Sequence, residues 1–113
     1  NAQFISQTVP TTMLKGQTYN ASITFKNTGN TIWSQAQYAI GTNNPENNWN
    51  FGLPRKYLNS SPLEIVLPGQ TKTFNFTVTA PLTAGSYNFQ WRMLQEGIGW
   101  FGPSSQNVVI TVN

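Results

Sequence analysis

The sequence predicts an all-β fold, an antiparallel β-sandwich of about seven strands. Apolar and polar residues alternate along most of the chain, as they do in strands that pack one face on a core. Turn signals rich in Gly, Pro and Asn separate these runs, and no stretch repeats its apolar residues at helical spacing. Strands are expected near residues 2–9, 18–27, 32–41, 63–67, 71–79, 85–95 and 107–112.

The alternating runs also indicate the core. Between Tyr19 and Phe25 every second residue is apolar, and the residues between them are Asn, Ser and Thr. The same rhythm continues in 71–79, 85–95 and 107–112. Burying one large apolar side chain contributes roughly 1.5–3 kcal/mol to stability. We expect the core to be formed around Trp33, Phe76, Tyr87, Phe89, Trp91 and Ile110.

Two similar turns each precede a strand, Leu14-Lys-Gly-Gln-Thr18 and Leu67-Pro-Gly-Gln-Thr71. A duplicated module would show similarity over a longer stretch. We therefore interpret them as equivalent turns within one sandwich. Residues 1–113 are expected to form a single domain, excised from a longer multidomain protein.

Tyr87 begins a late strand just after a turn, in the segment Thr83-Ala-Gly-Ser-Tyr87. This is the pattern of the tyrosine corner, in which the hydroxyl bonds back to the preceding connection of an immunoglobulin-like (Ig-like) sandwich. Trp33 falls where such a sandwich has its buried Trp, and Phe89 stands where antibody domains carry a Cys. Because the chain has no Cys, aromatic and aliphatic packing alone would hold this core.

Composition narrows the range of partners. The net charge is +3, from six basic and three acidic residues, and only 8 % of the residues are charged. The basic residues are scattered, which disfavours nucleic-acid binding, and no segment is apolar enough to insert into a membrane. A polar, uncharged surface is typical of extracellular and cell-surface modules, and the isolated domain is expected to be monomeric. N-glycosylation sequons, whose use stays open, stand at Asn20, Asn59 and Asn75.

The residue inventory also excludes most catalytic sites. Without His, Cys or Asp the chain cannot form a Ser-His-Asp or Cys-His triad, or an ordinary zinc, copper or non-haem iron site. Glu46, Glu64 and Glu96 lie on separate segments, so a glycosidase carboxylate pair is not expected. We expect no enzyme activity, no cofactor and no metal, with a weak calcium site in the Asn-rich loop 43–48 as an open alternative.

Two motifs carry a family resemblance. Residues 26–34, Lys-Asn-Thr-Gly-Asn-Thr-Ile-Trp-Ser, have the form N-x-G-x-x-x-W. Residues 80–93 have the form A-P-x-x-x-G-x-Y-x-x-x-W-R-M, and Gly97 and Phe101-Gly-Pro103 follow them. Together they resemble the Ig-like four-tryptophan (FW) domain, the "next to BRCA-one" central-domain type. That domain is named from a selective-autophagy receptor of eukaryotes, and similar domains occur in prokaryotic cell-surface and secreted proteins.

The resemblance implies an Ig-like sandwich without catalysis, used for protein contacts or as a module between other domains. Trp33 and Trp91 match family tryptophans. Ile23 stands where the eukaryotic form has its first Trp, and the last family Trp is missing near Gln106. These departures favour the prokaryotic, extracellular branch over an autophagy-type partner.

A few aromatic residues remain after the strand aromatics are assigned to the core. Under one interpretation Trp49, Phe51, Trp100 and Phe101 plug the open end of the sandwich. Under the other they form an exposed contact site, with Arg92 nearby, for a protein or a sugar. Phe101-Gly102 fits the family motif and is expected to be structural, so Trp100 is the better candidate for exposure.

Two functions are compatible with these observations. The first is a non-catalytic extracellular or cell-surface Ig-like module, acting as a structural spacer and as a protein-interaction or adhesion domain. The second is a carbohydrate-binding accessory module of a secreted hydrolase. An enzyme is disfavoured by the residue inventory.

Overall fold

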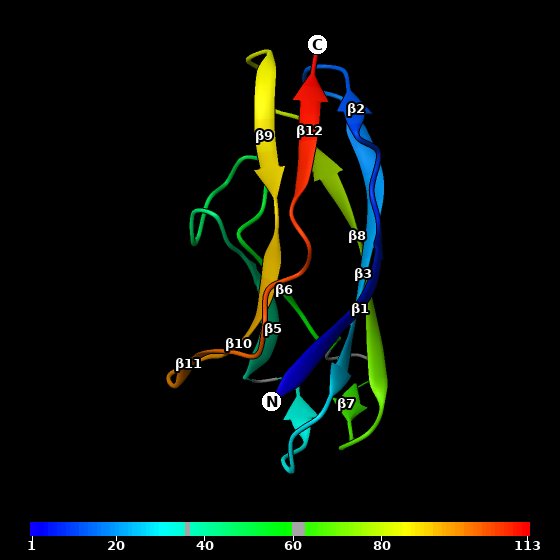
Figure 1. The fold of residues 1–113 in the computed structure, drawn as a ribbon, viewed down its shortest axis with the longest axis vertical. Helices are drawn as coiled ribbons and strands as arrows, with labels where there is room; N and C mark the ends of the chain where they lie inside the picture. Colours follow the sequence, from blue (N-terminus) through cyan, green and yellow to red (C-terminus); the bar gives the residue numbers. More distant parts are fainter. Residues whose placement is uncertain (36, 60–62) are drawn as a thin grey trace.

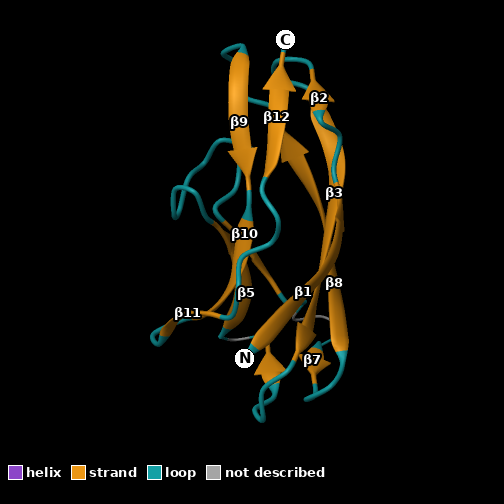
Figure 2. Cartoon of the chain, viewed as in Figure 1, coloured by secondary structure: helices purple, strands orange, loops and turns teal. Residues whose placement is uncertain are grey.

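The computed structural model of the protein describes residues 1–35, 37–59 and 63–113. All regular secondary structure in these ranges is β-strand, and Figure 2 accordingly draws no helix there. The strands, in chain order, are β1 (Ala2–Thr8), β2 (Thr12–Met13), β3 (Thr18–Asn27), β4 (Trp33–Ser34), β5 (Tyr38–Thr42), β6 (Arg55–Tyr57), β7 (Ile65–Val66), β8 (Thr71–Thr79), β9 (Gly85–Phe89), β10 (Trp91–Gln95), β11 (Gly99–Phe101) and β12 (Val108–Val112).

One layer of the sandwich is the antiparallel sheet β1-β3-β8. Its longest ladder joins β3 to β8, from the pair Thr18 and Thr79 to the pair Lys26 and Thr71. From Ala21 to Asn27 in β3 and from Phe74 to Val78 in β8 every second residue is buried, while the residues between them are polar and at least partly exposed. The strands expected at 18–27 and 71–79 are confirmed with these bounds.

The opposite layer contains the sheets β11-β10-β5-β6 and β2-β12-β9. They are continuous because β9 and β10 follow each other along the chain, separated only by Gln90 (Figure 1). At this break the Gln90 carbonyl accepts a hydrogen bond from the Asn43 amide, 2.8 Å away. Next to it the Trp91 amide donates to the Ser105 hydroxyl, also at 2.8 Å. A side chain and a loop thus replace part of the strand-to-strand hydrogen bonding at Gln90. The single strand expected at 85–95 is therefore two strands, β9 and β10.

Other expected strands also differ from those observed. The segment 32–41 contains two strands, β4 and β5, and residue 36 between them lies outside the described residues. The strand expected at 63–67 is only the two-residue β7, which pairs with β4. Three strands were not predicted: β2, β6 and β11. Each has two or three residues, too few for alternation to be visible in the sequence.

The architecture is an all-β Ig-like sandwich. The Tyr87 hydroxyl donates a hydrogen bond to the Thr83 carbonyl at 2.7 Å, which forms the tyrosine corner. Strand β2 pairs in parallel with the last strand, β12, so the start of the chain switches from one layer to the other. The two chain ends lie toward opposite ends of the molecule (Figure 1), whose extents are 43 × 27 × 24 Å.

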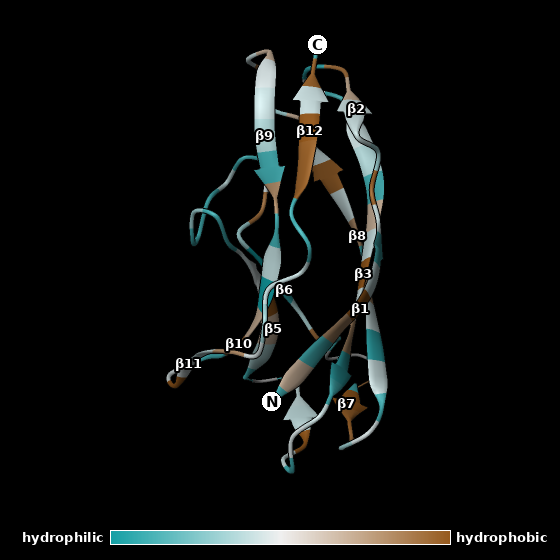
Figure 3. Ribbon diagram, in the orientation of Figure 1, coloured by the Kyte–Doolittle hydropathy of each residue, from teal (hydrophilic) through white to brown (hydrophobic). Residues whose placement is uncertain are grey.

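The interior between the layers is filled by aromatic side chains. Trp91 is 1 % exposed, and its ring packs edge-on against Phe76 and Phe89 at centroid distances of 5.1 and 5.9 Å. Trp33 and Ile110 are also fully buried, and Tyr87 packs against this core while remaining partly accessible. Figure 3 shows the alternation behind this packing as apolar and polar segments that follow one another along the strands.

We expect Trp91→Ala to lower the free energy of unfolding by about 3–5 kcal/mol, because it leaves a large cavity between the layers. Chemical denaturation followed by far-UV circular dichroism measures the change. Leu82→Ala is the control, because Leu82 is 82 % exposed and its truncation should cost less than about 0.5 kcal/mol. Equal midpoints for Trp91→Ala and the wild type would place that ring outside the interior.

An ion pair fastens the segment before β7 to strand β8. The Glu64 carboxylate accepts hydrogen bonds from the Lys72 ammonium group and, at 2.6 Å, from the Asn59 amide. Burial on its own would raise the pKa of Glu64. The Lys72 and Asn59 hydrogen bonds, with the charges of Lys72 and Lys56, outweigh burial, and the pKa of Glu64 lies below its ordinary value of 4.5.

Because the pKa of Glu64 is lower in the folded than in the unfolded state, its ion pair stabilises the fold above about pH 4.5. This contribution is lost as the pH falls through the folded-state pKa. Lys72→Met should raise the pKa of Glu64 and reduce the loss of stability between neutral and acidic pH. Urea midpoints from pH 3 to 7 test this, with Lys15→Met as the control at an exposed lysine. A pKa for Glu64 that is unchanged in Lys72→Met would contradict it.

Candidate functional site

The outward face of the sheet β11-β10-β5-β6 carries a small apolar cluster of its own. Trp100, Leu94, Ala39 and Tyr57 stand opposite one another in a row across the four strands. They alternate with the inward residues of the same strands, so their side chains point away from the core. Nevertheless Leu94 is only 4 % exposed and Ala39 is fully buried. Something on this face must therefore cover them.

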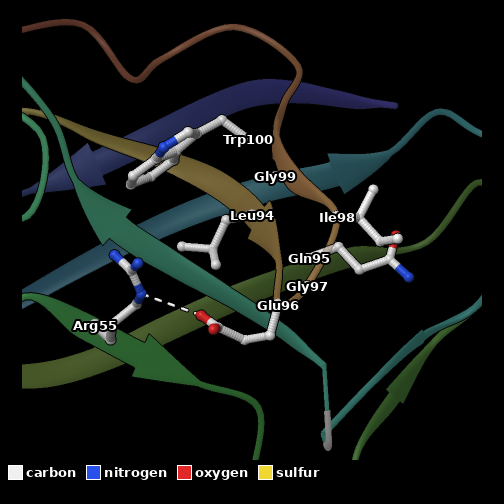
Figure 4. A pocket seen from close by; sticks show the side chains of 8 residues that line it. All are labelled: Arg55, Leu94, Gln95, Glu96, Gly97, Ile98, Gly99 and Trp100. Carbon is white, nitrogen blue, oxygen red and sulfur yellow. Dashed lines mark hydrogen bonds and ion pairs between the residues drawn. The ribbon is translucent and has the colours of Figure 1, made fainter.

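The covering group is the Trp100 side chain, together with Arg55 (Figure 4). A Cβ atom added to Gly41 would lie 2.7 Å from Trp100 Cη2, from Leu94 Cδ2 and from Arg55 Nη1. The three side chains therefore converge over the one position in β5 that has no side chain. The Arg55 guanidinium carbon lies 5.2 Å from the centroid of the Trp100 ring, a cation–π arrangement. We call Trp100, Arg55, Leu94, Ala39 and Gly41 the outer-face cluster.

Two further residues hold the Arg55 side chain. Its Nε donates to Glu96 Oε1 at 3.2 Å, and its Nη1 donates to Asn47 Oδ1. The pair of Arg55 and Glu96 is partly exposed, so it contributes about 0.2–1 kcal/mol and acts mainly by orienting the guanidinium group. Burial and the neighbouring Glu96 carboxylate raise the pKa of Tyr57 above its ordinary value of 10. Tyr57 is therefore a neutral phenol at physiological pH.

Beside the outer-face cluster lies an open hollow of about 310 Å³. Figure 4 shows it between Arg55 and Trp100 on one side and the β10–β11 turn on the other. Gly97 and Gly99 in this turn have φ angles of +80° and +134°, which favour glycine. They leave Ile98 at the tip with 78 % of its surface exposed. The hollow thus has an aromatic ring, an ion pair and an aliphatic tip on its surface.

The structure separates the residues that were expected to form one contact site. Trp100 belongs to the outer-face cluster, and Trp49 is 67 % exposed in the loop between β5 and β6. Phe51 does not belong to an exposed site, because it is 1 % exposed and its ring packs 5.7 Å from that of Phe89. Arg92 is partly buried, and its Nε donates to the Gly102 carbonyl at 2.6 Å. Arg92 thus positions the strand end after Trp100.

Sequence reasoning missed Arg55, Glu96, Leu94 and Gly41. One signal was present for Leu94: it is apolar but lies out of phase with the inward residues Trp91 and Met93. An apolar residue on the outward register of a strand indicates a second packing surface. No comparable signal pointed to Arg55, whose three-residue strand is not recognisable from the sequence.

Within the described ranges no three His, Cys, Asp or Glu side chains gather where they could hold a metal ion. Amides of the Asn-rich loop 43–48 bind other protein groups, such as Asn43 with the Ser104 hydroxyl and Asn48 with the Pro45 carbonyl. The described residues form no helix, and therefore none that is long and apolar enough to cross a membrane.

Comparison with known proteins identifies the family. A family model described as "Ig-like domain from next to BRCA1 gene" matches residues 8–113. The chain belongs to this family. This Ig-like domain is also similar to a solved β-glucosidase from Listeria innocua in complex with gluconolactone. The match has 13 % identity and a TM-score of 0.38, and it covers 100 % of this chain and 16 % of the other. A search of curated protein sequences found no match.

In this Ig-like domain the residues of the family motifs have packing roles. Trp33 and Trp91 are buried in the core. Gly102 of the Phe-Gly-Pro motif has a φ of +69°, and a Cβ there would lie 2.9 Å from the Cβ of Ala2 in β1. The glycine of this motif thus allows the segment that follows β11 to approach β1 closely. Trp100, one residue before this motif, is free of these constraints and contributes instead to the outer-face cluster.

Gly41→Ala should displace the Trp100 ring, because the added methyl group would overlap Trp100 Cη2 and Leu94 Cδ2. We expect a loss of about 1–3 kcal/mol in unfolding free energy and a clear rise in acrylamide quenching of Trp100. Quenching is measured in a Trp49→Phe background, in which Trp100 is the accessible indole. Gly69→Ala is the control for the quenching: its φ of +87° makes alanine unfavourable there and so lowers stability as well, but its Cβ would meet nothing within 4 Å and should leave the Trp100 ring in place. Unchanged quenching in Gly41→Ala would show that Trp100 does not cover Gly41.

Proposed function

We propose that this chain is a non-catalytic module of an extracellular or cell-surface protein, which spaces neighbouring domains and binds a protein partner through the outer-face cluster. The observation that carries the proposal is the Trp100–Arg55 pair, stacked at 5.2 Å over Gly41. Trp and Arg are the residue types that most often dominate binding energy at protein interfaces.

The pair is also held in place before any partner arrives. Glu96 and Asn47 fix the guanidinium group, and Gly41 and Leu94 receive the ring. A rigid contact group loses little conformational entropy on binding, so more of its interaction energy is available for affinity. Around it, the exposed Ile98 and the partly exposed Tyr57 extend the apolar area that a partner would cover.

The spacer role is supported by the shape of the molecule. The chain ends lie toward opposite ends of the longest axis (Figure 1), so neighbouring domains would be held apart by a rigid sandwich. The extracellular or cell-surface location is supported by composition, because 8 % charged residues leave a surface of Asn, Thr, Gln and Ser. We further propose that the isolated domain is monomeric.

A carbohydrate-binding accessory module of a secreted hydrolase is the second candidate. It is favoured by Trp49, which is 67 % exposed in a loop rich in Asn side chains. A titration with a polysaccharide panel, followed by tryptophan fluorescence, tests this candidate. A saturable shift that disappears in Trp49→Ala or Trp100→Ala would support it, and no shift with any glycan would remove it.

The protein-contact proposal is tested by site-specific photocross-linking. A benzoylphenylalanine at position 57, at the margin of the outer-face cluster, is exposed to surface proteins of the source cells, and position 82 at the far end of the domain is the control. We expect a discrete cross-linked protein from position 57 alone, lost in the Arg55→Ala background. Equal products from both positions, or products that persist in Arg55→Ala, would contradict the proposal.

A further inference from the structure

Strand β8 forms one edge of the sheet β1-β3-β8. The Gln70 carbonyl and the Ala80 amide, just before and just after β8, bond to the chain at the two ends of β3. Because backbone groups alternate in direction along a strand, those of the even-numbered residues face β3 and those of Thr73, Asn75 and Thr77 face away from it. Among the described residues, none donates to or accepts from these outward-facing backbone groups. The edge therefore carries a row of free hydrogen-bond donors and acceptors.

This edge lacks most of the devices that protect edge strands. Such strands usually carry a bulge, a proline or several charges that prevent pairing with another chain. Strand β1, at the other edge of the sheet, is interrupted by a register shift. The ladder of β8 is regular over its nine residues, which include no proline and one charged residue, Lys72. The Thr79 amide donates to the Phe51 carbonyl at 3.0 Å, so the open part of the edge is the segment Thr73–Thr77.

The side of the sandwich next to this edge carries an excess of positive charge. A narrow hollow of about 70 Å³ lies between β6 and β8, and Lys56 and Lys72 are among the residues that line it. Lys56 stands opposite the buried Ile40, so its side chain lies on the inner face of β6. Lys72 is paired with Glu64, whereas Lys56 forms no ion pair with any described residue. Two ammonium groups thus accompany one carboxylate, and an added acidic side chain would complement them.

We propose that the β8 edge binds an extended, acidic segment of a partner protein, which adds as a further strand beside Thr73, Asn75 and Thr77. Another extended backbone offers acceptors and donors at the repeat of about 6.6–6.8 Å that separates alternate residues of a strand. A carboxylate on the inward side of that segment would lie beside Lys56 and Lys72. Hydroxyl-bearing residues on its outward side would pair favourably with the Thr and Asn side chains of β8. This contact is separate from the outer-face cluster and goes beyond the function proposed above.

The test is a titration of the ¹⁵N-labelled chain with the capped heptapeptide Thr-Val-Thr-Glu-Thr-Val-Thr, compared with the same peptide carrying Lys in place of Glu. We expect saturable shifts of the Thr73, Asn75 and Thr77 amides with the Glu peptide, at a Kd of about 0.1–1 mM. The same amides should become protected from hydrogen exchange, and the Lys peptide should bind about threefold more weakly or worse. No saturable shift at about ten times the upper Kd, or equal affinity of both peptides, would overturn the inference.

Two variants separate the backbone and the charge contributions to this contact. Asn75→Pro removes one outward-facing donor, and an edge strand tolerates proline where the N–H faces solvent. It should weaken binding of the Glu peptide by about two- to tenfold. Lys56→Glu reverses the charge beside the edge and should weaken binding by about threefold or more, whereas Lys15→Glu, the matched control at an exposed lysine, should leave the Kd unchanged. Equal affinities in the two Lys→Glu variants would contradict the site.

Other outcomes distinguish this contact from a second copy of the chain and from the outer-face cluster. Concentration-dependent shifts of the β8 edge amides without any peptide would contradict the proposal, because a second copy of this chain would then occupy the edge. Arg55 lines the outer hollow but not the one beside β8, so Arg55→Ala should abolish the photocross-link and leave the peptide Kd unchanged. Loss of peptide binding in Arg55→Ala would contradict the assignment to the β8 edge.

Discussion

The whole molecule depends on the packing of two sheet faces around Trp91. Neither layer can be stable alone, because each has one apolar face that must be removed from water. Trp91 lies where the two layers meet, and its contacts with Phe76 and Phe89 join β8 of one layer to β9 of the other. With no disulfide to hold the layers, this aromatic packing replaces the covalent link of antibody domains.

The alternation of apolar and polar residues predicted the strands that are long and have one solvent-exposed face. The segments 18–27 and 71–79 satisfy both conditions, and their bounds are those of β3 and β8. The strand expected at 32–41 overlaps β5, but alternation is not visible there, because all five residues of β5 are buried. One side of β5 faces the core and the other faces the outer-face cluster, so the sequence there shows no polar side. The tyrosine corner at Tyr87 was predictable because it depends on a local turn rather than on distant contacts.

The candidate site was only partly predictable, for a related physical reason. Trp100 was recognisable as an unassigned aromatic residue, but its partners come from β5, β6 and β10, and only the sheet register brings them together. Phe51 looks like a loop aromatic in the sequence. In the fold its carbonyl accepts from the Thr79 amide at 3.0 Å, which draws the loop against the core and buries the ring.

Family residues and contact residues are thus physically distinct. The motif residues Trp33, Trp91 and Gly102 are explained by packing between layers and against β1. The candidate contact residues lie outside that packing, on the outward face around Trp100 and Arg55 and at the hairpin tip. An Ig-like sandwich supplies the rigid frame, and function is carried by the side chains placed on it.

The most direct measurement is ¹⁹F NMR of the chain labelled with 5-fluorotryptophan, which gives one resonance for each of its four tryptophans. The solvent isotope shift between H₂O and D₂O reports the exposure of each ring. It should be absent for Trp33 and Trp91, large for Trp49 and intermediate for Trp100. A Trp91 resonance with a full isotope shift would contradict the two-layer core, and a Trp100 resonance as sensitive to solvent as that of Trp49 would contradict the outer-face cluster.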